Sequence, residues 1–248
     1  MTPLLVVAGV AIALGAALQS ATGFGFALVS APLVFAALGP QEAIGTLLVL
    51  GTEVSLLMLA AERRRPRPLG RDAAVMVAAA LPGALAGVAV LRSLDAVTLQ
   101  VAVTLGVVAT LLVRRLASRR AEPSRRPAWA APAAGFTAGA LSTSTNTSGP
   151  PLLLHLMGRG ADPVRVRDTI TVCFLGLSAV SVAALWLTRT SGAVPDAGVL
   201  AATVPLVAIG TLLGRRLFSR LARSGSYESV LTGVLVVAVV TGLLTALL

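Results

Sequence analysis

The chain has 248 residues, of which 56% are hydrophobic and 12% charged, and its mean hydropathy is +0.90. Apolar runs of about 20 residues, enough to cross a ~30 Å hydrocarbon layer, recur along its whole length. These values exclude a soluble domain and predict an all-α polytopic membrane protein. Every basic residue is arginine, and the net charge of +10 is concentrated between the apolar runs. Such loops are topology signals and contacts for anionic lipid, so the lipid bilayer, and no nucleic acid, is the expected partner.

The first half of the chain, residues 1–113, is predicted to form one broken hairpin followed by three transmembrane helices. Its opening apolar stretch, residues 3–38, is too long for one ordinary span. Polar and glycine residues interrupt this stretch, namely Gln19, Ser20, Thr22, Gly23 and Gly25. The three spans are expected at residues 42–61, 73–91 and 96–113, with a proline-broken basic loop at residues 62–72.

A cytoplasmic basic linker, residues 114–127, is predicted to separate this half from a second membrane repeat, residues 128–248. The second repeat opens with residues 128–157, which are interrupted by consecutive hydroxyl and amide side chains at residues 142–148. Backbone that leaves a helix at membrane depth must be buried in protein or line a water-filled cavity. This break is therefore expected to form half of a substrate site. Further spans are expected at residues 168–187, 196–213 and 228–247, with a basic loop at residues 215–223.

The two halves resemble one another when the chain is shifted by 123 residues. The shift superimposes Pro40 on Pro163, Thr46 on Thr169, Thr22 on Thr145, and Ser55 on Ser178. If residues 128–157 crossed the membrane once, 12 arginines would lie inside and 8 outside, whereas a re-entrant hairpin places 18 inside and 2 outside. The positive-inside rule favours the hairpin. Each half then holds one hairpin and three spans, which predicts two inverted repeats with about eight membrane segments in all.

Each break carries a glycine-containing motif. The first is Gly-Phe-Gly-Phe-Ala-Leu-Val-Ser-Ala-Pro-Leu at residues 23–33, and the second is Asn-Thr-Ser-Gly-Pro-Pro-Leu at residues 146–152. In these motifs and in its layout the chain resembles the sulfite exporter TauE/SafE family of anion permeases. The resemblance implies export or uptake of a small sulfur-containing or organic anion such as sulfite, a sulfonate or sulfoacetate. Asn146, Thr147 and Ser148 stand where the family has mostly glycine, which leaves the identity of the anion open.

An anion at the membrane midplane needs positive potential without a costly buried charge. Helix N-termini supply it through unpaired N–H groups and the helix dipole, and two such ends are expected, after Gly25 and at Pro150. The predicted substrate-binding residues are Gln19, Ser20, Thr22, Gly23, Gly25, Ser144, Thr145, Asn146, Thr147, Ser148 and Gly149. The alternative is that these side chains cap their own helix ends and satisfy one another.

Two further residues are candidates for coupling or gating. Glu53 is an acid near the centre of a span, where ionisable groups are expensive and usually functional. Either it carries a proton coupled to substrate movement, or it faces inward and is hydrogen-bonded to a neighbouring hydroxyl. His155, the single histidine, is either a gate or proton relay or a packed imidazole. No second metal ligand stands near it in sequence, so no metal and no cofactor are expected, and Cys173 is expected to be a packing residue.

The sequence therefore predicts a secondary transporter that works by alternating access around two polar hairpin tips in the cell membrane. A passive anion channel of the same architecture is the alternative. A chain with one histidine, one cysteine and no phosphate-binding Gly-x-x-x-x-Gly-Lys loop offers little to an enzyme or an ATP-driven pump. The direction of transport, the coupling ion and the oligomeric state are left open by the sequence.

Overall fold

A computed structural model describes residues 3–62, 65–95, 97–99, 101–102, 105–106, 108, 127–157, 159, 162–190 and 192–224. Within these residues all regular structure is helical and no strand occurs. The predicted span at residues 228–247, nearly all of the linker at residues 114–127 and much of the span at residues 96–113 lie outside the described residues.

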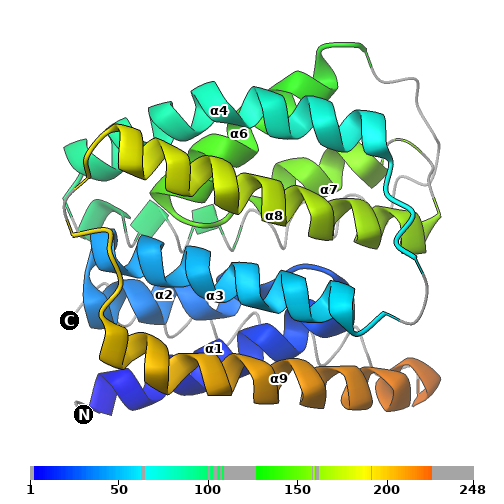
Figure 1. Ribbon diagram of the computed structural model, residues 1–248, viewed down its shortest axis with the longest axis horizontal. Coiled ribbons are helices and arrows are strands. Elements are labelled where there is room, and N and C mark those ends of the chain that lie inside the picture. Colours follow the sequence, from blue (N-terminus) through cyan, green and yellow to red (C-terminus); the bar gives the residue numbers. More distant parts are fainter. Residues whose placement is uncertain are drawn as a thin grey trace.

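The described residues form eight helices that lie side by side along one common direction (Figure 1). They are α1 Pro3–Thr22, α2 Phe26–Leu38, α3 Pro40–Ala60, α4 Gly70–Ser93, α6 Ala130–Ser144, α7 Gly149–Met157, α8 Pro163–Leu187 and α9 Ala197–Ser224. Among these described helices, five are long and apolar enough to cross a membrane, namely α1, α3, α4, α8 and α9. The chain is thus an integral, multi-pass membrane protein, as the composition predicts.

The helix bounds agree with the predicted spans to within about three residues, except at the start of α8 and at the end of α9. Helix α8 begins at Pro163, five residues before the predicted span at 168–187, because Asp162 caps it and proline suits the first helical position. Residues 215–223, predicted to be a basic loop, continue helix α9 as far as Ser224. Arginine and leucine are good helix formers, so the charges of this segment do not end the helix. Helix α7 begins at Gly149, one residue before the predicted start at Pro150.

Both predicted breaks are present. Helices α1 and α2 are separated at residues 23–25, where Gly23 has φ 88° and Gly25 has φ 115°. Helices α6 and α7 are separated at residues 145–148, where Asn146 has φ 56°. Left-handed backbone ends an α-helix and is open mainly to glycine and asparagine, so these three residues fix where the helices stop.

Two helix pairs pack at very short range through glycine. In the α4–α6 pair, a Cβ added at Gly83 would lie 2.0 Å from the carbonyl oxygen of Phe136. In the α1–α9 pair, a Cβ added at Gly210 would lie 2.2 Å from the carbonyl oxygen of Ala13. Small residues let helix backbones approach closely in membrane proteins, so both pairs depend on the absence of a side chain at these glycines.

The contacts of the two pairs occupy corresponding positions. The hydroxyl of Thr143 donates to the carbonyl of Ala84 over 2.8 Å, and that of Ser20 donates to the carbonyl of Thr211 over 3.0 Å. Thr143 follows Ser20 by 123 residues, and Thr211 follows Ala84 by 127. Helix α8 has 25 residues and α3 has 21, and this difference of four accounts for the larger spacing.

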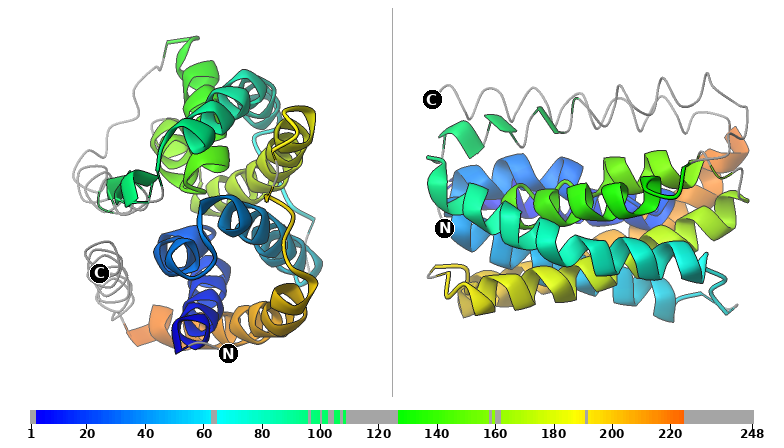
Figure 2. Two further views of the ribbon diagram at one scale, coloured as in Figure 1. Left: turned by 90° about the vertical axis from the view of Figure 1, so that its left-hand side faces the viewer. Right: turned by 90° about the horizontal axis from the view of Figure 1, so that it is seen from above.

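The two hairpins open toward opposite ends of the bundle. At one end Arg159 binds Asp72, Arg167 binds Glu62, and Arg215 donates to the carbonyl of Ala61. This arginine-rich end also holds the start of α6 and the end of α7. The start of α3 lies at the other end, where Gly45 packs against Ala193 before α9 begins. Figures 1 and 2 show that the start of α1 and the end of α2 lie at this second end.

Candidate functional site

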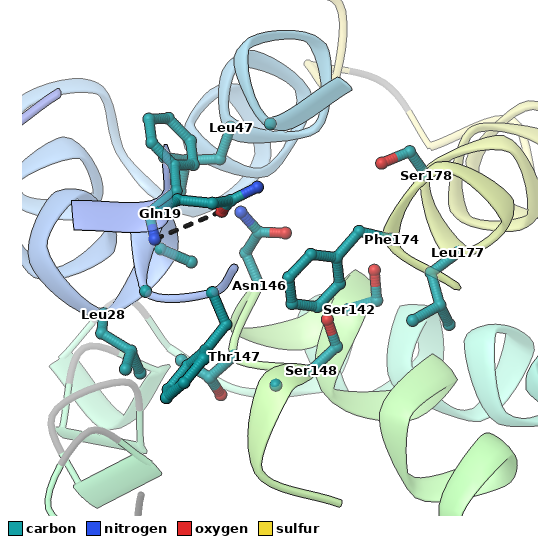
Figure 3. A pocket seen from close by; sticks show the side chains of 16 residues that line it. Gln19, Leu28, Leu47, Ser142, Asn146, Thr147, Ser148, Phe174, Leu177 and Ser178 are labelled. Atoms are coloured by element: carbon teal, nitrogen blue, oxygen red, sulfur yellow. Dashed lines mark hydrogen bonds between the residues drawn. The ribbon is translucent and has the colours of Figure 1, made fainter. Parts of the chain in front are cut away.

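One pocket lies between the two breaks and takes residues from both (Figure 3). Its cavity volume is about 50 Å³. It is lined by Gln19, Phe24, Gly25, Phe26, Ala27, Leu28, Leu47, Gly51, Ser142, Asn146, Thr147, Ser148, Gly149, Phe174, Leu177 and Ser178. None of these side chains is charged, so the polarity of the pocket comes from amides, hydroxyls and backbone.

On the side of the first break, Gln19 supports the start of α2. Its side-chain oxygen accepts a hydrogen bond from the backbone N–H of Phe26 over 3.3 Å, and its amide nitrogen donates to Ser55 over 3.4 Å. The first N–H groups of a helix have no partner within the helix. Gln19 satisfies the first of them, and the next two residues, Ala27 and Leu28, line the pocket.

On the side of the second break, three of its four residues, Asn146, Thr147 and Ser148, line the pocket together with Gly149, the first residue of α7. The Thr147 hydroxyl lies 2.7 Å from that of Thr145. The side chains of Asn146 and Ser148 make no hydrogen bond with another described residue, and Figure 3 shows Asn146 reaching into the pocket toward the side of Gln19. Ser178 of α8 likewise lines the pocket and has no hydrogen bond with another described residue. Asn146, Ser148 and Ser178 are therefore the lining side chains most available to a ligand.

Five predicted site residues lie beside the pocket rather than in its lining: Ser20, Thr22, Gly23, Ser144 and Thr145. The two serines and Thr145 donate to backbone carbonyls, which a hydroxyl inside a helix commonly does. The Thr22 hydroxyl bonds the backbone of Phe24 on both its N–H and its carbonyl, which shapes the first break. The contacts of these four polar side chains agree with the alternative expectation, in which polar residues at the breaks cap helix ends and satisfy one another.

Several lining residues were missed by the sequence reasoning. Phe24, Phe26, Leu28, Leu47, Phe174 and Leu177 give the pocket an apolar wall, and nothing in the sequence separates them from ordinary core residues. Ser142 falls within residues 142–148, which were expected to form half of the site although Ser142 was not among the named site residues, and Ser178 could have been added from the sequence. Ser142 begins the polar run of the second break, and Ser178 is the residue that the 123-residue shift superimposes on Ser55.

Glu53 and His155 both lie outside the pocket lining. Glu53 is half-buried on α3, two residues beyond Gly51, and its Oε2 atom is buried with no hydrogen-bond partner among the described residues. His155 is buried in the last turn of α7, and its Nε2 lies 3.4 Å from Asp72. Asp72 also accepts two hydrogen bonds from Arg159, over 2.9 and 3.1 Å.

Arg167 is the cation that contacts the first break. Its guanidinium donates to the carbonyl of Ser20 over 3.2 Å and pairs with Glu62 over 2.9 Å. Its aliphatic stem occupies the space beside Gly23, where an added Cβ would lie 2.7 Å from Arg167 Cγ. The predicted span at residues 168–187 leaves this arginine in the preceding loop, but it begins the second turn of α8. It contacts Gly23, whose neighbour Phe24 lines the pocket.

Fold and site together define a multi-pass membrane protein with a small, uncharged polar pocket between two broken hairpins. Residues 7–244, nearly the whole chain, match the family model described as sulfite exporter TauE/SafE, and the chain belongs to this family of membrane transporters. The resemblance seen in the two glycine-containing motifs is thereby confirmed. No curated protein and no solved structure matches the chain.

Proposed function

We propose that this protein is a secondary transporter that binds a small sulfur-containing or organic anion, such as sulfite, a sulfonate or sulfoacetate, in the pocket between the breaks. The observation that carries this function is that residues from both breaks line one pocket. A pocket with hydroxyl, amide and backbone donors and no carboxylate suits an anion, since anion oxygens accept hydrogen bonds.

The two breaks contribute differently to anion binding. Helix α2 presents free N–H groups at Ala27 and Leu28, together with the positive end of its dipole. Helix α7 starts with Gly149 followed by Pro150 and Pro151, and proline has no backbone N–H. The second break therefore offers its dipole and its side chains, Asn146 and Ser148 above all, rather than a row of backbone donors.

The size of the cavity favours the smallest of the candidate anions. About 50 Å³ is room for roughly four waters, at about 10–15 Å³ for each in this measure. Sulfite has a similar number of non-hydrogen atoms. Sulfoacetate and larger sulfonates have about twice as many, so they would require the pocket to widen. We therefore place sulfite first among the substrates.

An alternating-access mechanism is supported by the contacts that correspond in the two halves. Ser20 with α9 and Thr143 with α4 make the same kind of hydrogen bond at the same place in each hairpin. The hairpins open toward opposite ends, as inverted repeats do in transporters. In this proposal the membrane repeats comprise residues 1–113 and 128–248, the arginine-rich end faces the cytoplasm, and the protein resides in the cell membrane.

Binding of sulfite to purified protein tests the pocket directly. Isothermal titration with sulfite is expected to give saturable binding, and Asn146→Leu or Ser148→Ala should weaken it by about tenfold, the effect of one hydrogen bond to a charged ligand. Thr137→Val is the matched control, because this hydroxyl lies on α6 and bonds only carbonyls of its own helix. Equal binding by all four proteins would place the anion elsewhere.

A further inference from the structure

We propose that Arg167 forms a second anion subsite beside the first break, at which the transported anion displaces Glu62 on its way between the pocket and the arginine-rich end. This inference rests on the proposed function. It gives the ion pair between Arg167 and Glu62 a direct role in substrate binding.

The position of Arg167 is the first observation. Its stem packs on Gly23 and its guanidinium bonds the Ser20 carbonyl, so the charge lies directly against the break. Phe24, the next residue after Gly23, lines the pocket. The pocket itself holds no charged side chain. An anion leaving it toward the arginine-rich end therefore meets this guanidinium beside the break.

The bonding of the guanidinium is the second observation. NH1 pairs with Glu62 and NH2 with Ser20, whereas the Nε–H group is buried and has no hydrogen-bond partner among the described residues. A charged donor without an acceptor is costly. An anion with several oxygens can bind two N–H groups of one guanidinium at once, which a single Glu62 oxygen on NH1 does not do.

The exposure of the ion pair is the third observation. The side chains of Arg167 and Glu62 are 31% and 23% exposed, so solvent reaches the pair and an anion can compete for it. Exchanging Glu62 for a substrate anion conserves the ionic contact of Arg167.

The first and second breaks also differ at this point. The 123-residue shift superimposes Ile44 of α3 on Arg167 of α8. Ile44 is fully buried, so the position of α3 that corresponds to Arg167 is apolar. The two halves share their helix contacts, but the first break alone receives an arginine at this position. The subsite therefore serves one end of the transport path.

Two substitutions that break the same ion pair separate a substrate role from a structural one. Arg167→Gln removes the proposed ligand and should weaken sulfite binding about tenfold. Glu62→Gln removes the competitor and should tighten sulfite binding roughly two- to fivefold. Arg167→Lys keeps the charge but loses the two-donor geometry of the guanidinium, so its affinity for sulfite should lie between those of Arg167→Gln and the wild type. A purely structural pair would give Arg167→Gln and Glu62→Gln effects of the same sign.

Isothermal titration of the full-length chain with sulfite is the measurement, with Arg215→Gln as the control. Arg215 lies at the same end, donates to the carbonyl of Ala61, and its loss changes the net charge equally. If Arg167→Gln does not fold, Glu62→Gln alone decides, because tighter binding supports the subsite and unchanged or weaker binding overturns it. Absence of sulfite binding by the wild-type protein would instead refute the proposed function.

Discussion

The glycines between paired helices give a quantitative test of how the two halves are held together. A Cβ at Gly83 would lie 2.0 Å from Phe136 O, and one at Gly210 would lie 2.2 Å from Ala13 O. Carbon and oxygen in contact are normally about 3.3 Å apart or more. Alanine at either position therefore forces two helices apart by about 1 Å along a close-packed interface.

The expected loss of stability follows from two opposing terms. Overpacking costs about 1–3 kcal/mol, and replacing a helical glycine by alanine returns up to about 1 kcal/mol through helix propensity. We expect Gly83→Ala and Gly210→Ala each to lower the free energy of unfolding by about 1–2 kcal/mol. At about 2–4 °C per kcal/mol for a chain of this size, the melting temperature should fall by about 2–8 °C.

Loss of helical circular dichroism on heating, with the purified protein in detergent, measures this effect. Gly70→Ala is the control, because it lies on the same helix as Gly83 and an added Cβ would meet nothing within 4 Å. Its melting temperature should equal or exceed that of the wild type. A fall with Gly83→Ala but not with Gly210→Ala would refute the energetic equivalence of the two interfaces and weaken the proposal of inverted repeats.

Three further predictions concern individual polar groups. Ser20→Ala and Thr143→Val each remove one buried hydrogen bond between helices and should cost about 1 kcal/mol apiece in thermal unfolding; a much larger loss for one would show that the two bonds are not equivalent. Asp72→Asn removes the charge that Arg159 faces and should lower stability by about 1–2 kcal/mol, less than a fully buried pair because Arg159 is partly exposed; a salt titration of the melting temperature would show no difference from wild type if the pair were idle. Glu53→Gln should abolish pH-driven anion accumulation in liposomes while leaving the Kd for sulfite within about twofold, or about 0.4 kcal/mol, because Glu53 lies outside the pocket lining; undiminished anion flux would favour a passive channel.

The sequence identified the breaks because their signals are local. Glycine and asparagine at left-handed positions, and hydroxyls in an apolar run, act within a few residues of themselves, so Gly23, Gly25 and Asn146 could be placed without knowledge of any partner helix. Proline likewise marks a helix start, but Pro40 and Pro163, which each stand at the first residue of a helix, lie two and five residues before the predicted spans. The layout of helices around the breaks followed from these signals and from apolar length.

The sequence predicted the residues of the site less well than it predicted the breaks, because the role of each side chain depends on which neighbour it contacts. Thr143 and Ser20 are as polar as Asn146, yet carbonyls of adjacent helices take their hydroxyls. Nothing in the local sequence names those carbonyls. The role of Arg167 was hidden for the same reason. Arg167 lies close to other arginines in the sequence, a pattern typical of charges that face solvent. Only the packing of α8 against the first break brings it to Gly23.

The asymmetry between the breaks bears on how the proposed pocket would hold an anion without a charged wall. In this proposal the positive potential comes from oriented N–H groups, and it is strongest where a helix starts with residues that have an N–H. Pro150 and Pro151 remove two such groups from α7, while α2 keeps them and has Arg167 beside its break. Binding strength should therefore reside mainly at the first break, and the choice among anions at the second, where Asn146 and Ser148 supply donors of fixed direction. Substitutions at the second break should accordingly change the ranking of sulfite against larger sulfonates more than those at the first.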